Sequence, residues 1–151
     1  MRILDADEAR HCVDGLVHFD TQRAPDGLDL TVEGVFEVTG AGKLDFGGSE
    51  FDPAPRERIH SELSSPDDDY GWWELDAGSY VIHYNEGLEL DAGQVGKLHP
   101  LPRLQQAGAS HGTVVLHGTR ETLAALLTVG QGGCDLKENC RISRLTITEP
   151  S

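Results

Sequence analysis

The sequence predicts a single all-β domain. Short apolar segments recur along the chain at intervals of roughly 8 to 12 residues, and polar turns separate them. Glycine is frequent, with 18 residues in a chain of 151, and no linker-like stretch divides the chain. Regularly spaced short strands are typical of β-barrels and β-sandwiches. We therefore expect one barrel or sandwich over residues 1–151.

The N-terminal part is expected to contain one short helical turn followed by a long strand. Residues 5–12 (DADEARHC) begin with acids, which a helix N-terminus favours. Residues 28–36 combine β-branched, apolar and acidic residues as a half-buried strand does. A glycine-rich turn at 39–43 follows, and Leu44 and Phe46 are predicted to begin the next strand.

Residues 47–71 are predicted to form a long loop. This stretch contains Pro53, Pro55, Pro66 and three consecutive acids at 67–69, which do not fit a central strand. Loops of this length in compact domains are usually functional or disordered.

The remaining strands are expected between residues 72 and 148. Apolar segments predict them at 72–73, 79–86, 88–90, 95–99, 112–118, 123–129 and 140–148. A helical turn is expected at 103–108. The glycine-rich stretch 130–133 (GQGG) is interpreted as a turn, because a phosphate-binding loop would be followed by a helix.

The charge is strongly negative. The chain has 26 acidic and 12 basic residues, a net charge of −14, and only three lysines beside nine arginines. Direct binding to DNA or RNA is excluded as a function class, because it needs a basic stripe. A high charge can simply keep a protein soluble. The sharper interpretation is adaptation to molar salt, in which acidic self-repulsion is screened.

Neither a membrane span nor a disulfide framework is expected. The longest apolar run, Leu123–Leu127, is far shorter than the roughly 20 residues that cross a bilayer. The N-terminal residues are acidic and contain no secretory apolar region, so we expect a cytoplasmic protein. Cys12, Cys134 and Cys140 form no CxxC pair, which predicts idle thiols, with a Cys134–Cys140 bridge as the alternative.

Histidine spacing suggests one possible metal site. His111 and His117 stand six residues apart, so on one extended segment they would share a face, and His99 could be a third ligand. Coincidence is the alternative, because seven histidines are scattered through the chain.

Five segments in order resemble a known family: GLDL (27–30), LTVEGVFEVTGAGKLDF (30–46), LDAGSYVIHYNEGLELDAGQVG (75–96), HPLPRLQQAGA (99–109) and LLTVGQGGCDLKENCRISRL (126–145). Together they are similar to archaeal members of the dUTPase and dCTP deaminase superfamily. The resemblance implies a distorted, jelly-roll-like β-barrel that forms a homotrimer with sites at subunit interfaces. It also implies hydrolysis of dUTP to dUMP and diphosphate, with Mg²⁺ on the phosphates.

The nucleotide-gripping motif of the family, P-R-S-S-L, is altered here. Pro100 and Leu104 match it, but Leu101, Pro102 and Arg103 stand at the positions of its arginine and two serines. Arginine supplies a fork of donors to phosphate oxygens, which leucine and proline do not. Arg103 is the predicted substitute for the missing charge.

The motif that resembles W-D-P-G-Y-x-G is altered as well. Residues 115–119 (VLHGT) contain neither its water-activating aspartate nor its sugar-packing tyrosine. His117 is the predicted catalytic base, because an imidazole can accept the proton of the attacking water. In the alternative register Leu116 occupies the aspartate position. Residues 124–127 (AALL) lack the glutamate expected of the deaminase branch, which makes deamination the weaker hypothesis.

Two charged residues keep their family positions. Asp29 in GLDL and Arg141 in NCRISRL match, and both are predicted to bind the nucleotide, together with Arg103. The structural alternative is that Asp29 bonds local backbone amides and that Arg141 forms a surface ion pair. Glu86 matches the family's Y-x-x-x-x-x-E segment and is interpreted as structural.

Two functional hypotheses follow. The first is a dUTP nucleotidohydrolase with weakened activity. The alternative is a catalytically silent relative that keeps the barrel and binds a nucleotide or assembles with an active homologue. The altered motifs at 101–103 and 115–119 are what separate the two hypotheses.

The charge generates a prediction about salt. Because the excess negative charges repel one another, screening should stabilise the fold, and the midpoint of thermal unfolding should be several degrees higher in molar potassium chloride than in dilute buffer. Thermal melts in the two buffers, followed by circular dichroism, measure the difference. An equal or lower midpoint in salt would contradict adaptation to molar salt.

Overall fold

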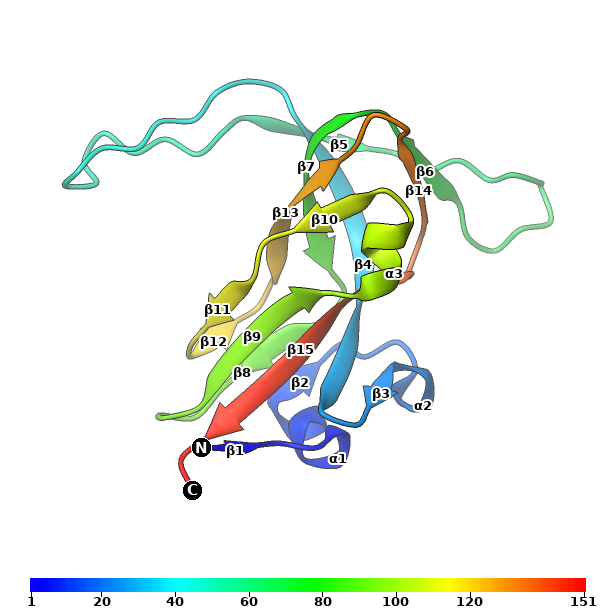
Figure 1. Ribbon diagram of the computed structural model, residues 1–151. Coiled ribbons are helices and arrows are strands. Elements are labelled where there is room, and N and C mark those ends of the chain that lie inside the picture. The colour runs from blue at the N-terminus through cyan, green and yellow to red at the C-terminus, as the bar shows by residue number, and fades with distance from the viewer.

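The computed structural model describes all residues, 1–151, and consists mainly of antiparallel strands (Figure 1). The elements are β1 (Arg2–Ile3), α1 (Ala6–Ala9), the 3₁₀ helix η1 (Arg10–Cys12), β2 (Val13–Asp14), α2 (Phe19–Gln22), β3 (Arg23–Ala24), β4 (Gly27–Val38), β5 (Arg56–Ile59), β6 (Trp72–Leu75), β7 (Gly78–Tyr84), β8 (Gly87–Glu89), β9 (Val95–Pro100), α3 (Pro102–Gln106), β10 (Ala109–His111), β11 (Val114–Leu116), β12 (Thr119–Arg120), β13 (Ala124–Val129), β14 (Cys134–Lys137) and β15 (Arg141–Glu149). The predicted all-β class is confirmed, and so are the short N-terminal helix and the helical turn near 103–108.

The main sheet curls into a nearly closed barrel. Its strands follow the order β10-β13-β7-β4-β15-β9-β11, and β1, β3 and β5 pair alongside. β10 and β11 stand at opposite ends of this order, yet only Gly112 and Thr113 join them. Such a link spans roughly 10 Å, so the two ends of the sheet lie close together. The predicted distorted barrel is confirmed.

The long strand β4 connects the two halves of the barrel. Leu28–Thr31 pair with β15, whereas Val32–Val38 pair with β7 and β5. The pairing shifts register between Val32 and Gly34, where the strand changes from one half to the other. The inward side chains of β4 belong to one buried core, and Leu28, Leu30, Val32 and Val35 are completely buried.

A buried carboxylate fixes β4 next to this register shift. Glu86 is fully buried, and its Oε1 accepts a hydrogen bond from the Thr31 backbone N (2.9 Å). Its Oε2 accepts from Thr31 Oγ1 (2.6 Å) and Gln22 Nε2 (2.8 Å). Burial raises the pKa of Glu86, and these donors oppose that effect. Asn85 Nδ2 donates to Thr31 Oγ1 (2.9 Å) and to Asn139 Oδ1 (2.8 Å), so α2, β4 and the two turns before β8 and β15 meet here. These contacts agree with the structural interpretation of Glu86.

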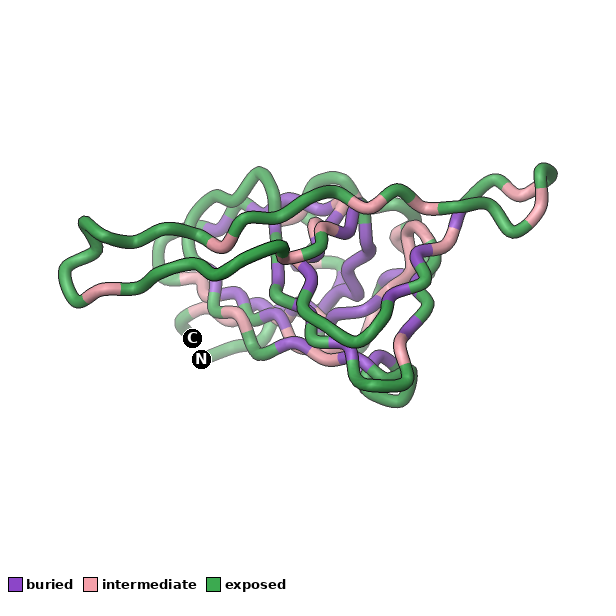
Figure 2. The backbone as a smooth tube through the Cα atoms, turned by 90° about the horizontal axis from the view of Figure 1, so that it is seen from above, coloured by how far each residue is buried: buried purple, intermediate pink, exposed green.

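The strand predicted to begin at Leu44 and Phe46 is wrong. Both side chains are exposed in a loop, residues 39–55, that projects from the barrel (Figures 1 and 2). A second loop, residues 60–71, projects on the other side, and β5 lies between the two loops inside the stretch predicted as one long loop. Apolar residues alternate at 44 and 46, but no neighbouring strand pairs with them.

The cysteines are unpaired and the helices are short. Cys12, Cys134 and Cys140 are free thiols, so the alternative Cys134–Cys140 bridge is excluded. No helix has the length and apolar character needed to span a membrane.

The Glu86 network generates a prediction about stability. Glu86→Gln exchanges one accepting oxygen for an amide that donates, and this amide would face the donors of Thr31 or Gln22. We expect a loss of about 2–3 kcal/mol in the free energy of unfolding, measured by denaturant titration. Glu89→Gln, an exposed position on β8, is the matched control and should be nearly neutral. Equal stability of the two variants would show that the buried carboxylate is dispensable.

Candidate functional site

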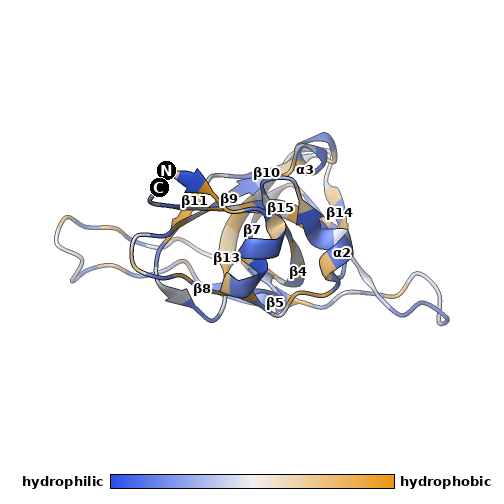
Figure 3. Ribbon diagram, turned by 90° about the horizontal axis from the view of Figure 1, so that it is seen from below, coloured by the Kyte–Doolittle hydropathy of each residue, from blue (hydrophilic) through white to orange (hydrophobic).

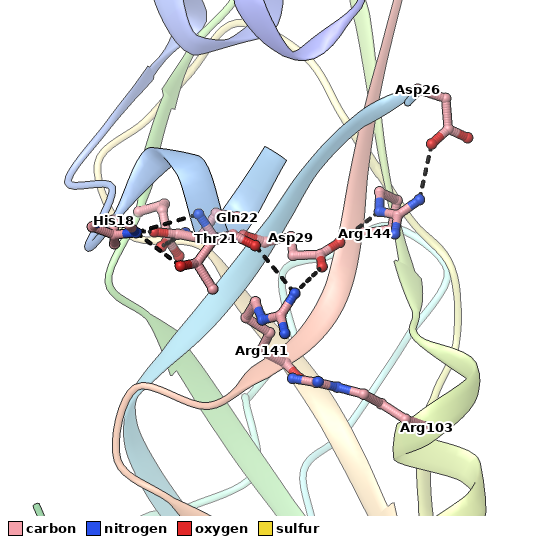
Figure 4. Close-up of polar contacts among 9 residues, drawn as sticks. His18, Thr21, Gln22, Asp26, Asp29, Arg103, Arg141 and Arg144 are labelled. Carbon is pink, nitrogen blue, oxygen red and sulfur yellow. Dashed lines mark hydrogen bonds and ion pairs between the residues drawn. The ribbon is translucent and has the colours of Figure 1, made fainter. Parts of the chain in front are cut away.

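Two arginines share one buried carboxylate. The pairing of β4 with β15 places Arg144 opposite Asp29 and Arg141 opposite Thr31. The Asp29 side chain is only 6% exposed, and its Oδ2 accepts from Arg141 Nη1 (3.0 Å) and its Oδ1 from Arg144 Nε (2.6 Å) (Figure 4). Because both of its oxygens are occupied, Asp29 holds the two guanidinium groups in fixed orientations.

Arg141 keeps donors available to a ligand. Its Nη1 also donates to the Thr21 carbonyl (3.2 Å), whereas its Nε and Nη2 have no partner within the chain. Arg103, on α3, donates from Nε (3.3 Å) and Nη2 (2.9 Å) to the backbone carbonyl of Arg141. The structure therefore brings together the three residues that the sequence predicted to bind substrate: Asp29, Arg103 and Arg141 (Figure 4).

These arginines line a pocket of about 200 Å³, which we call the arginine pocket. It is lined by Val17, His18, Thr21, Gln22, Thr31, Arg103, Asn139, Cys140 and Arg141. Guanidinium forks bind phosphate oxygens strongly and in fixed geometry. Pockets that enclose a small molecule usually measure roughly 300–1,000 Å³, so the arginine pocket fits part of a nucleotide and not the whole.

Among the lining residues that were not predicted as site residues, two are titratable, His18 and Cys140. His18 Nδ1 accepts from the Thr21 backbone N (3.3 Å) and lies 2.8 Å from Thr21 Oγ1, so Nε2 carries the ring proton. Burial raises the pKa of Cys140 to about 11, which keeps the thiol protonated near neutral pH. Cys140 therefore does not supply a nucleophile. No local sequence signal marks either residue as part of a site, because the pocket is assembled from segments that are far apart in the chain.

His117 lies apart from the arginine pocket. It is exposed in the turn between β11 and β12, and it makes no hydrogen bond within the chain. Leu116 points inward and is a core residue. Of the two residues that could occupy the family's aspartate position, only His117 faces solvent.

A second hollow, of about 500 Å³, opens where the two ends of the sheet meet. It is lined by Ser110, His111, Gly112, Thr113, Val114, Leu126 and Thr128, and we call it the seam hollow. Leu126 projects into it from β13, within the segment where the deaminase branch would need a glutamate. The seam hollow therefore offers several hydroxyl groups but no carboxylate, and both nitrogen atoms of its one imidazole, His111, are hydrogen-bonded within the chain.

A buried hydrogen-bond chain supports the seam. His111 Nδ1 lies 2.7 Å from the Gly112 carbonyl and must donate to it. Its Nε2 therefore accepts from Ser143 Oγ (2.7 Å), and Ser143 in turn accepts from the Tyr84 hydroxyl (2.6 Å). Burial lowers the pKa of His111 and raises that of Tyr84, so both groups are neutral near pH 7.

The predicted shared face of His111 and His117 is wrong. The extended segment is interrupted between β10 and β11. His111 points into the buried hydrogen-bond network, whereas His117 stands in a solvent-exposed turn. No three His, Cys, Asp or Glu side chains come together in a metal-ligating group.

A solved structure has the same fold. The crystal structure of 2'-deoxycytidine 5'-triphosphate deaminase from Agrobacterium tumefaciens matches 98% of this chain with a TM-score of 0.69 and 13% sequence identity. The match covers 48% of the deaminase chain, so this protein spans about half its length. The protein thus has the dUTPase-like β-barrel fold.

Sequence comparison identifies the family. Probable deoxyuridine 5'-triphosphate nucleotidohydrolases from Methanosarcina acetivorans and Aeropyrum pernix are 30% and 31% identical to the chain, over 96% and 82% of its length. The matches cover 86% and 73% of those proteins. No family model matches. The chain belongs to the dUTPase family, within the superfamily that includes the dCTP deaminases, as the sequence resemblance predicted.

The buried histidine generates a prediction about pH. Because burial lowers the pKa of His111, the unfolded chain binds a proton more readily than the folded chain. Stability should therefore be retained above the ordinary histidine pKa of about 6.5 and decline as the pH falls below it.

The contribution of His111 is isolated by His111→Gln. Denaturant titrations at about pH 7 and about pH 5 should give a smaller difference in the free energy of unfolding for the variant than for the unaltered protein. The pKa of His83 is also lowered, by burial and by Arg56, so His83→Gln is the matched comparison. If the difference in the free energy of unfolding between the two pH values is the same in His111→Gln as in the unaltered protein, His111 does not contribute to the pH dependence of stability.

Proposed function

We propose that the protein is a dUTPase-type nucleotidohydrolase that converts dUTP and water to dUMP and diphosphate in the cytoplasm. One observation carries the proposal: Arg103 and Arg141, at positions within segments that resemble family motifs, line one pocket. The relatives that match most of the chain bear the name of this activity. The class of substrate, a deoxyuridine triphosphate, rests on that kinship.

In this proposal the arginine pocket takes the phosphates. Arg141 offers Nε and Nη2, and Arg103 adds a second positive charge beside it. Asp29 acts as a positioning residue, since both of its oxygens are bound to Arg141 and Arg144. Direct contact between Asp29 and a nucleotide would require one of these ion pairs to open.

Magnesium enters as part of the substrate. The arginine pocket is lined by no carboxylate, so its residues do not fit a resident Mg²⁺, which prefers oxygen ligands and retains several waters. In the family Mg²⁺ lies on the phosphates, and here we expect it to arrive bound to the triphosphate.

Attack on the α-phosphate needs a base that takes a proton from water. His117 is the proposed base. It does not line the arginine pocket, and in this proposal the homotrimer expected from the family brings the two parts together. The seam hollow, which is larger than the arginine pocket, would then hold the nucleoside.

The alternative function is a silent relative that binds a nucleotide without turnover or assembles with an active homologue. The turn at 115–119 favours it, because this turn contains no carboxylate and its only titratable side chain, His117, has no residue to orient it. Loss of a positioned base typically lowers a rate by a factor of about 10² to 10⁴.

Diphosphate release from dUTP, with dCTP as the comparison nucleotide, tests the proposal in molar potassium chloride with magnesium. We expect weak turnover of dUTP, which His117→Ala abolishes. Arg103→Ala should weaken dUTP binding roughly 10-fold to 100-fold. Arg120→Ala, exposed and outside both pockets, is the matched control.

The outcomes separate the two functions. Binding of dUTP that depends on Arg103, without turnover, would support the silent relative. Strong turnover that is unaffected by His117→Ala would place the base elsewhere. Absence of binding would contradict both the enzyme and a silent relative that binds a nucleotide.

A further inference from the structure

Two tryptophans line a pocket at the base of the loop 60–71. This loop projects from the barrel on the side opposite the loop 39–55, and its outer end is hydrophilic (Figure 3). The pocket measures about 270 Å³, and we call it the indole pocket. It is lined by Ile59, His60, Glu62, Leu63, Ser64, Trp72, Trp73 and Glu74. It shares no lining residue with the arginine pocket or the seam hollow.

Hydrogen bonds fix the walls of the indole pocket. Glu62 N donates to the Trp72 carbonyl (2.9 Å), and Trp72 N donates to the Glu62 carbonyl (2.8 Å). Trp73 is only 4% exposed, and its Nε1 donates to the Ile59 carbonyl (2.9 Å). The two ends of the loop are therefore joined, and the pocket is formed before any ligand enters it.

A contact within the chain shows that the Trp72 ring takes a cation. Lys137 Nζ lies 5.5 Å from the centroid of this ring, and Lys137 does not line the indole pocket. Tryptophan attracts cations more strongly than the other aromatic side chains do. The other cation–π contacts of the chain each place an arginine over a phenylalanine, whereas no arginine lies over a tryptophan. The side of Trp72 that lines the pocket is thus without a cation of its own.

Two unpaired carboxylates border the rings. Glu62 and Glu74 are exposed, and neither side chain forms an ion pair or a hydrogen bond within the chain. The pairing of β14 with β6 places Asp135 opposite Glu74, and like charges in such a pair destabilise a sheet. Residues 60–76 contain six acids and neither lysine nor arginine, so His60 is the only lining side chain that can carry a positive charge. The indole pocket therefore combines aromatic walls with a negative rim.

We propose that the indole pocket binds a guanidinium group. This ion is planar, it stacks on aromatic faces, and it is more weakly hydrated than an ammonium ion. Its fork of donors matches a carboxylate, which Glu62 and Glu74 supply beside the rings. Pockets that enclose a drug-sized molecule measure roughly 300–1,000 Å³, so the indole pocket fits one arginine-like side chain. The proposal is independent of nucleotide turnover.

Tryptophan fluorescence tests the proposal, because Trp72 and Trp73 are the only tryptophans of the chain. The full chain is titrated in molar potassium chloride with N-acetyl-arginine amide, and N-acetyl-citrulline amide, its uncharged isostere, is the comparison. We expect the arginine compound to change the fluorescence saturably with a Kd of roughly 1 mM. The citrulline compound should bind at least about tenfold more weakly, because it lacks the charge.

Variants test the rim and the wall. Glu74→Gln should weaken binding of the arginine compound roughly fivefold to tenfold, without unfolding the chain, because the side chain is exposed and unpaired. Glu121→Gln, exposed and outside the pocket, is the matched control and should bind normally. Trp72→Leu should abolish binding, measured by saturation-transfer NMR of the arginine compound, and circular dichroism checks that this variant is folded.

The guanidinium group can belong to a free compound or to a protein. An acetylated Gly-Gly-Arg-Gly-Gly amide distinguishes these sources: tighter binding of the peptide than of the single residue assigns the site to a protein segment, and equal or weaker binding assigns it to a small compound. A response that does not saturate, equal binding of the citrulline compound, or binding that Glu74→Gln and Trp72→Leu both leave unchanged would overturn the proposal. Because no step measures dUTP, these outcomes leave the proposed enzymatic function to its own test.

Discussion

The rest of the structure depends on the burial of the Glu86 carboxylate against Thr31. A fully buried carboxylate is costly unless donors surround it, and here Thr31 and Gln22 supply all three donors. They fix β4 at the residue where it leaves β15 and turns to β7. Because Arg141 pairs opposite Thr31 and Asp29 lies two residues before it, the same contacts set the position of the arginine pocket. A residue 55 positions away in the sequence thus orients the proposed phosphate site.

Asp29 has an electrostatic role that its family position alone does not reveal. A carboxylate between two guanidinium groups neutralises part of their mutual repulsion, so Arg141 and Arg144 can stand on one strand close to Arg103. The net charge of −14 repels a triphosphate at long range. In molar salt the Debye length is about 3 Å, so long-range repulsion is screened, whereas hydrogen bonds from fixed arginines still act at contact distance. A local positive site on an acidic protein is therefore compatible with anion binding at high salt.

Sequence reasoning succeeded where one strand face is buried. In β13 the residues Ala125, Leu127 and Val129 point inward and alternate with exposed ones, so the pattern at 123–129 was informative. It failed at Leu44 and Phe46, where the same alternation belongs to a hairpin that no strand covers. The arginine pocket was found in part, because Arg103 and Arg141 lie in segments that resemble family motifs. His18 and Asn139 could not be found, because they reach the pocket through contacts between segments far apart in the chain.

The barrel fold and the proposed chemistry depend on different side chains. This separation explains how the chain can keep the fold although its motifs differ from those of the family. In β11 and β13 the inward residues, Leu116 and Leu127 among them, are apolar and belong to the core. The segments in which the family resemblance implies a carboxylate, 116–117 and 124–127, include His117 and Leu126 here, and both of these side chains are solvent-exposed. Exchange of an exposed side chain usually changes stability by no more than about 0.5 kcal/mol. Selection on folding therefore places almost no constraint on these two positions. A catalytic carboxylate can be lost there while the fold, the buried Glu86 network and the paired arginines remain.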